Sequence, residues 1–218
     1  MKELRTAGLI LDHLDQEMAW RIKEVHQFKI AVEKASGKNV DAHVRAGVSM
    51  LYAHWEGFIK GAANAYVNYL SYRTIRNNEI KPCFVALGLR SKFITGNTAK
   101  SEIAVQMVTY LLDEMDKPLR LPRSDAITAE SNLNSSVFLN ILGWIGLDPT
   151  PYSSRFPLID STLLANRNRI AHGEYLNISA DRFYELTSEV LELLRWFKTD
   201  IENSVVSNNF LLKIETDK

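Results

Sequence analysis

Cysteine is almost absent from this sequence of 218 residues, in which Cys83 is the only one. A single cysteine excludes an internal disulfide and any zinc site built from several thiolates, because both need more than one thiol group. This usage suits a reducing cytoplasm and argues against redox chemistry.

The sequence also lacks an excess of charge of either sign. Its 26 Lys and Arg residues balance 26 Asp and Glu residues, so the formal net charge is zero. A general duplex-DNA binder normally has a strongly basic surface, and the charge balance argues against that class. The charge balance is still compatible with binding of a small or transient RNA target through a local basic patch.

Long hydrophobic runs are missing as well. The apolar run at residues 7–11 is too short for a secretory signal. No stretch reaches the roughly eighteen apolar residues that a membrane-spanning helix needs. We therefore expect a soluble, cytoplasmic protein without a membrane segment, since polar and charged side chains interrupt the most hydrophobic region: Arg45, His54, Glu56 and Lys60.

The usual enzyme motifs are absent. The sequence contains no glycine-rich phosphate loop, no dinucleotide fingerprint, no G-x-S-x-G and no H-E-x-x-H, so common nucleotide-binding and hydrolase classes lose support. We expect no metal and no cofactor, because metal sites need several convergent ligands. Four histidines in the first part of the chain lack a partner at ligand spacing: His13, His26, His43 and His54.

What the chain does contain is helical periodicity. Apolar residues recur at intervals of three and four along most of its length, which is the spacing of one face of an α-helix. We expect an all-α fold, an antiparallel bundle of about five or six helices in a single domain of residues 1–218. The expected helices cover residues 4–35, 41–72, 101–115, 132–146, 160–172 and 179–205.

The segment 73–130 is interpreted as an insertion between the second and third core helices. It has more loop signals than the rest, including Pro82, Pro118 and Pro122, and only one clear helical run. Its basic residues could form an ordinary solvated surface or could contact RNA phosphates. These residues are Arg73, Arg76, Lys81, Arg90, Lys92, Lys100, Lys117, Arg120 and Arg123.

The most informative stretch is the end of the expected helix at 160–172. Asp160 is the predicted N-cap, and Gly173 fits the left-handed position that stops a helix. Within this helix Arg167 shares a row with Leu163 and Ile170, which should face the core. A permanently charged group in such a row needs either a partner or a function.

Two further polar residues accompany this arginine. Asn168 and His172 are four residues apart and therefore lie on one face near the helix end. Arginine can bind phosphoryl oxygens, and an imidazole can transfer protons near neutral pH. In the alternative interpretation, Arg167 is an internal arginine neutralised by Glu56, and His172 only interacts with the helix dipole.

The order Arg167, Asn168, His172, Gly173, Glu174 resembles the R-x-x-x-x-H signature of the HEPN superfamily, in which a polar residue typically follows the arginine. Residues 52–60 and 130–134 resemble the MAE-like bacterial branch of that superfamily. This resemblance implies a helical bundle that dimerises and brings two copies of the signature together. It also implies metal-independent RNA cleavage in toxin–antitoxin or phage-defence systems.

The resemblance assigns roles to the candidate residues. His172 would transfer protons, Arg167 would stabilise transition-state charge and Asn168 would orient the site, with the 2′-hydroxyl of RNA as nucleophile. Expected partners are a second copy of the chain, an RNA substrate and a cognate antitoxin or defence protein. The competing hypotheses are a non-catalytic HEPN module that binds RNA or a protein, and a plain helical adaptor. Four neighbouring residues are candidates for positioning or substrate binding: Glu56, Lys60, Arg169 and Glu174.

Overall fold

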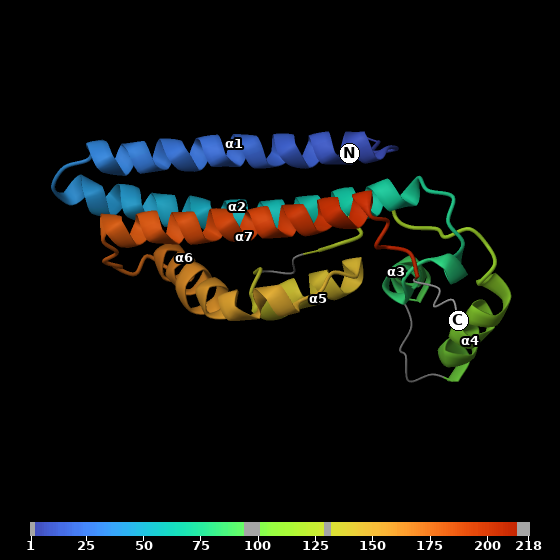
Figure 1. Ribbon diagram of the computed structural model, residues 1–218. Helices are drawn as coiled ribbons and strands as arrows, with labels where there is room; N and C mark the ends of the chain where they lie inside the picture. The colour runs from blue at the N-terminus through green and yellow to red at the C-terminus, as the bar shows by residue number, and fades with distance from the viewer. Residues whose placement is uncertain (1–2, 94–100, 129–131, 213–218) are drawn as a thin grey trace.

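Three long helices form one side of the molecule (Figure 1). The computed structural model describes residues 3–93, 101–128 and 132–212. This described part contains seven α-helices and no strand, which confirms the all-α prediction. The helices are α1 (Ala7–Lys34), α2 (Lys38–Ser71), α3 (Pro82–Phe93), α4 (Ser101–Glu114), α5 (Ser135–Ile145), α6 (Ala165–Ala171) and α7 (Ala180–Val206).

Helices α1 and α2 form an antiparallel hairpin, and α7 lies along α2 (Figure 1). Gly37 makes the turn between α1 and α2 with a φ of 56°, a conformation that glycine adopts without a steric penalty. The stripe predicted for α2 is buried: Val44, Val48 and Trp55 are each 0% exposed. The apolar residues that recur along α2 are therefore buried in the packing of the hairpin.

Phe138 joins α5 to the long helices α2 and α7. Its ring makes an edge contact with Trp55 of α2, at a centroid distance of 5.0 Å. It also contacts Tyr152 at 5.1 Å and Phe197 of α7 at 5.8 Å. Such aromatic pairs add to the free energy gained from burial. This contact places α5, and the segment after it, against α2.

The described part of residues 73–130, the segment interpreted as an insertion, contains two α-helices where the sequence predicted one. The 73–93 part was expected to be loop, but α3 begins at Pro82, a residue that favours the first position of a helix because its missing N–H is not needed there. Gly88 lies inside this helix. Here it permits close packing, since a Cβ at Gly88 would lie 2.7 Å from the Arg120 carbonyl oxygen.

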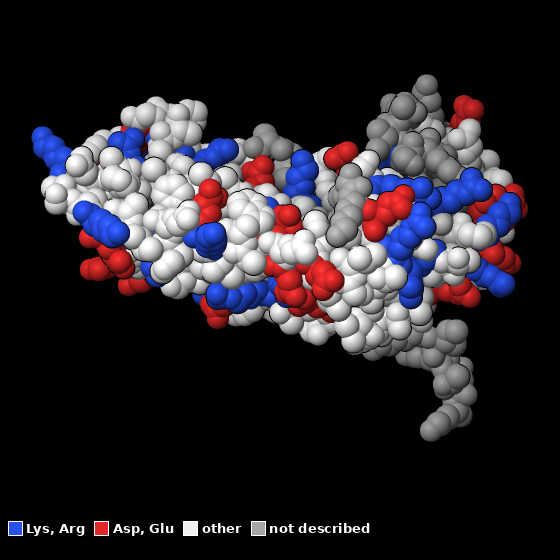
Figure 2. Space-filling view, turned by 90° about the horizontal axis from the view of Figure 1, so that it is seen from above, with Lys and Arg blue, Asp and Glu red and all other residues white. Residues whose placement is uncertain are grey.

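Several basic side chains of the insertion contact other parts of the protein. Arg73 lies over the ring of Tyr69, and Arg90 lies over the ring of Trp144. Figure 2 shows Lys and Arg gathered at the insertion end of the molecule, interleaved with acids. The side chain of Lys92 and the whole of Lys100 lie outside the described residues. The RNA contact proposed for this surface stays a prediction.

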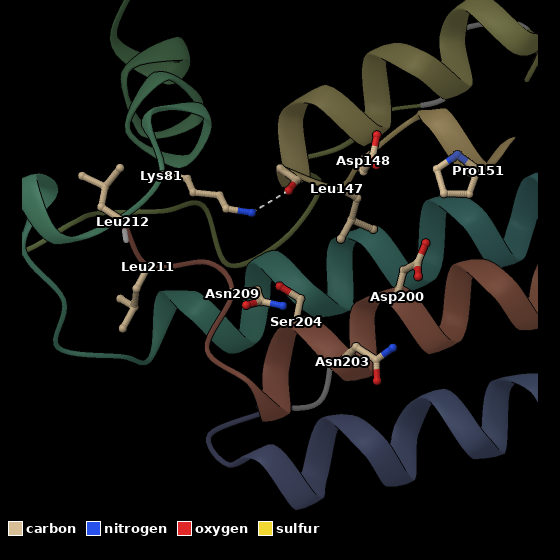
Figure 3. A pocket seen from close by; sticks show the side chains of 11 residues that line it. Lys81, Leu147, Asp148, Pro151, Asp200, Asn203, Ser204, Asn209, Leu211 and Leu212 are labelled. Atoms are coloured by element: carbon tan, nitrogen blue, oxygen red, sulfur yellow. Dashed lines mark hydrogen bonds between the residues drawn. The ribbon is translucent and has the colours of Figure 1, made fainter. Parts of the chain in front are cut away.

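A pocket of about 580 Å³ lies between the insertion and the ends of α5 and α7 (Figure 3). On one side the Lys81 Nζ donates a hydrogen bond to the Gly146 carbonyl oxygen at 2.9 Å. On the other side Asp200 accepts a hydrogen bond of 2.5 Å from the Tyr152 hydroxyl. These polar groups join structural elements to one another, and we assign them a structural role.

No helix in the described part of the chain is both long and apolar enough to span a membrane.

Candidate active site

The helix that carries Arg167 begins earlier than the sequence predicted. The prediction of Asp160 as its N-cap is wrong, because a π-helix spans Leu158–Leu164 and continues directly into α6. The Asp160 carboxylate instead accepts hydrogen bonds from the backbone N–H of Ser135 at 2.7 Å and from its hydroxyl at 2.5 Å. It thus satisfies a donor at the start of α5, where the helix dipole also favours an anion.

The end of α6 matches the prediction. Gly173 has a φ of 77° and occupies the left-handed position after the helix. Its N–H donates to the Ile170 carbonyl oxygen at 3.0 Å, and the Glu174 N–H donates to the Arg169 carbonyl oxygen at 2.9 Å. This pair of bonds is the Schellman arrangement, which makes His172 the C-cap residue.

Charged side chains reinforce this turn. The Arg169 Nε lies 3.0 Å from a carboxylate oxygen of Glu174, and both side chains are about half exposed. The Arg45 Nη2 on α2 donates to the Glu174 carbonyl oxygen at 3.2 Å. Arg169 and Glu174 therefore lie beside His172 at this turn. Exposed ion pairs of this kind contribute little to stability.

Arg167 is partly buried and lies between three side chains. Its Nη1 donates a hydrogen bond of 2.9 Å to the side-chain oxygen of Asn132 and one of 2.8 Å to the side-chain oxygen of Asn168. Its guanidinium carbon lies 4.7 Å from the centroid of the Tyr52 ring. Among the residues that the structure describes, no carboxylate forms an ion pair with Arg167.

Helix α2 determines where Asn132 lies. The Tyr52 hydroxyl accepts a hydrogen bond of 2.8 Å from the Leu133 N–H, and the Trp55 Nε1 donates one of 3.3 Å to the Leu133 carbonyl oxygen. The backbone N–H and carbonyl oxygen of Leu133 are therefore both hydrogen-bonded to α2. This places the side chain of the neighbouring Asn132 within reach of the Arg167 guanidinium.

Tyr52 remains neutral over the physiological pH range. Burial, followed by a hydrogen bond to Glu56, raises the pKa of Tyr52 to about 12. The neutral ring provides a cation–π surface for Arg167, and its hydroxyl remains a hydrogen-bond donor. Glu56 thus contacts Tyr52, whereas the sequence suggested a direct contact between Glu56 and Arg167.

Lys60 lies one helical turn beyond Glu56 and is exposed. It lines a surface depression between α1 and α2 together with Glu17 and His13. The described contacts include no ion pair between Lys60 and Glu56, although their spacing of four residues would allow one. The structure therefore brings Glu56, but not Lys60, into the group of side chains around Arg167.

His172 is exposed, and its side chain forms no hydrogen bond or ion pair with the described residues. The backbone N–H of His172 donates a hydrogen bond of 2.9 Å to the Asn168 carbonyl oxygen, the ordinary bond between residues four apart in an α-helix. Arg167 precedes it by five residues, which turns the two side chains about 140° apart around an α-helix. Within the single chain Arg167 therefore lies with Asn168, and the imidazole faces outward.

The sequence assigned no role to Asn132 or Tyr52, although both belong to the stretches 130–134 and 52–60 that resemble the MAE-like branch. Asn132 precedes Arg167 by 35 residues, so helical spacing gives no information about their contact. Its neighbours Glu130 and Ser131, which belong to the stretch that resembles the MAE-like branch, lie outside the described residues.

The helical bundle and the arginine–histidine helix end define a HEPN domain, a class whose members are generally ribonucleases or otherwise related to RNA and commonly act as dimers. The chain belongs to the RiboL-PSP-HEPN family, whose sequence model matches residues 16–203. This match does not confirm the MAE-like branch. Searches of curated proteins and of solved structures found no match.

Proposed function

We propose that this protein is a metal-independent endoribonuclease of the toxin–antitoxin or phage-defence type, and that it belongs to the MAE-like branch. Its site would combine Arg167, Asn168 and His172 from two subunits. The observation that carries this proposal is the environment of Arg167, which is held by neutral groups only among the described residues. A partly buried structural arginine is normally neutralised by a carboxylate, whereas a phosphate-binding arginine must keep its charge available.

The proposed reaction uses the nucleophile that RNA carries. The 2′-oxygen attacks the adjacent phosphorus, and its proton passes to a histidine acting as base. The bond from phosphorus to the 5′-oxygen of the next nucleotide breaks, and that oxygen receives a proton from an acid. The products are a 2′,3′-cyclic phosphate and a free 5′-hydroxyl. Arg167 would bind the phosphoryl oxygens, on which negative charge increases in the transition state.

Two proton transfers need two groups, and one protomer offers a single histidine in this motif. We assign one transfer to His172 and the other to the partner subunit's His172. Asn168 would help to orient both residues. Its side-chain oxygen accepts a hydrogen bond from Arg167, and its backbone oxygen accepts one from the backbone N–H of His172. Arg169 and Glu174 would border the imidazole, Glu56 would position Tyr52 beside Arg167, and Lys60 would contact the bound RNA.

The second candidate function is a HEPN module that binds RNA or a protein partner without cleaving it. The outward position of His172, separate from Arg167 within one protomer, favours this candidate if the chain does not dimerise through the same face. The two functions differ in their products, so one assay separates them.

The test incubates the purified protein with fluorescently labelled single-stranded RNA in the presence of EDTA. The endoribonuclease proposal expects cleavage that persists in EDTA and products that end in a 2′,3′-cyclic phosphate. A matched RNA with one 2′-deoxy nucleotide should resist cleavage at that position. Binding of both RNAs without product formation would instead establish the non-catalytic module.

Asn132→Ala should reduce RNA cleavage by about tenfold, because Arg167 would lose one of its two hydrogen-bond acceptors and its fixed orientation. The parent and variant would be compared by single-turnover cleavage rates and by urea unfolding. The matched control is Asn177→Ala, which changes an exposed asparagine after the motif. An Asn132→Ala protein that is fully folded and cleaves at the parent rate would remove Asn132 from the site.

A further inference from the structure

Helix α4 carries an uncovered apolar surface. Four aliphatic side chains of this helix are strongly exposed: Val105 is 63% exposed, Val108 55%, Leu111 46% and Leu112 79%. No residue of α4 is buried. Monomeric proteins rarely leave a contiguous group of large apolar side chains in water, and such groups commonly mark sites of protein interaction.

The helix has two distinct faces. Its inner face carries the half-buried side chains Ile103, Met107 and Tyr110, of which Tyr110 packs against the core. The Tyr110 hydroxyl accepts a hydrogen bond of 3.3 Å from Asn77. The exposed residues Val105, Val108 and Leu112 follow on the other side at intervals of three and four. We call these three residues and Leu111 the outer face of α4.

This spacing fits a helical partner. Intervals of three and four are those of the a and d positions in a coiled coil, where each apolar side chain inserts between residues of a facing helix. Figure 1 shows α4 at the end of the molecule, away from the three long helices. The inner face already attaches α4 to the insertion, so a second helix could pack on the outer face without displacing it.

The charges of α4 select the kind of partner. Within Ser101–Glu114 the charged residues are Glu102, Asp113 and Glu114, and the helix contains no Lys or Arg. Glu114 is half-buried and pairs with Lys117 at 2.6 Å, so Glu102 and Asp113 are the acids beside the outer face. Pairing two copies of α4, parallel or antiparallel, would therefore place acids against acids beside the apolar seam, which disfavours association. A helix with basic residues beside its apolar stripe would place opposite charges together.

We propose that the outer face of α4 binds an amphipathic helix of a partner protein, with an aliphatic stripe flanked by lysine or arginine. The interaction uses a face separate from the Arg167 site and does not depend on the ribonuclease proposal. It is a helix-on-helix contact in which the aliphatic residues provide the affinity and Glu102 and Asp113 select the charge of the partner.

The test measures fluorescence anisotropy with the full-length protein and two labelled synthetic helices of about three heptads. Both helices carry leucine at a and d; one carries lysine at e and g and the other glutamate. The proposal expects the lysine helix to bind at least about tenfold more tightly than the glutamate helix. Equal binding of the two helices, or no binding of either, would overturn it.

Two sets of variants locate the contact. Val108→Ser with Leu112→Ser should weaken binding of the lysine helix by about tenfold or more, and Asp113→Lys should shift the preference towards the glutamate helix. The matched control, Leu139→Ser with Val206→Ser, changes exposed aliphatic side chains on α5 and α7 and should leave binding unchanged. All four substituted apolar positions are exposed, so the bundle should remain folded.

Sedimentation of the protein without peptide tests whether a second copy of this chain occupies the outer face of α4. If Val108→Ser with Leu112→Ser lowers the molecular mass of the protein without peptide, the outer face joins two copies of this chain and the proposal is wrong. RNA cleavage by the same variant should equal that of the parent. If no variant, parent included, cleaves RNA, the ribonuclease proposal fails while the peptide measurement remains decisive for α4.

Discussion

His172→Ala protein should cleave RNA at least about 100-fold more slowly than the parent, because proton transfer by a positioned side chain typically contributes that much or more. The substitution removes an exposed side chain that has no hydrogen-bond partner among the described residues. It leaves the Schellman turn intact, since that turn uses backbone groups only. The loss should therefore appear in the rate and not in the fold.

The measurement is a single-turnover cleavage assay with urea unfolding of the same preparations. The free energy of unfolding should change by less than about 0.5 kcal/mol, the usual range for surface substitutions. His26→Ala removes another exposed histidine, on α1, and should cleave like the parent. A folded His172→Ala protein with the parent rate would end the assignment of His172 to proton transfer.

Arg167→Ala should lower the cleavage rate by about 100- to 1,000-fold, the range found when a donor to transition-state charge is removed. Arg167→Lys should recover little of this loss. An ammonium group keeps the charge but cannot bind two phosphoryl oxygens as a planar fork does, and it cannot stack on Tyr52 in the same way. Rates and RNA affinity would be measured separately for both variants.

A purely structural role for Arg167 would give a different pattern. The protein would lose stability, and the folded fraction would keep its activity. Because Arg167 makes two hydrogen bonds and a ring contact without an ion pair among the described residues, we expect a stability loss of only about 1–2 kcal/mol. In bacteria, toxicity of the expressed parent that Arg167→Ala and His172→Ala both relieve would support the catalytic role.

Mixed dimers of the parent with His172→Ala protein test whether one site uses both subunits. Such a dimer, verified by mass, holds one His172 where the proposed site needs two. If the site is shared, the mixed dimer should cleave at least about 100-fold more slowly than the parent dimer. A mixed dimer that keeps one site at the parent rate would instead show that each chain carries a complete site of its own.

The long helices could be predicted because burial repeats along them. Val44, Val48 and Trp55 follow the helical interval, and all are buried in α2. Gly173 could also be predicted, because only a residue that tolerates positive φ suits the turn after α6. Helix α3 was missed because Pro82 was interpreted as a loop signal, whereas it occupies the first position of the helix.

The contacts of the site were less accessible to sequence reasoning. Spacing correctly indicated that Arg167 faces other side chains and needs partners. It could not identify Asn132, because a loop residue reaches the guanidinium only after α2 has fixed Leu133. The prediction that Asp160 caps the Arg167 helix was wrong for a similar reason. Its partner Ser135 precedes it by 25 residues, and the local pattern suggested a nearer cap.

The bonds at Leu133 have a consequence for when the protein can act. The surroundings of Arg167 combine residue 52, residues 132–133 and residues 167–168, which come from the first quarter, the middle and the last third of the chain. No partial chain that stops before α6 can assemble them. A chain still under synthesis therefore lacks this arrangement, and the proposed site would form only after the last of these segments has folded onto the first.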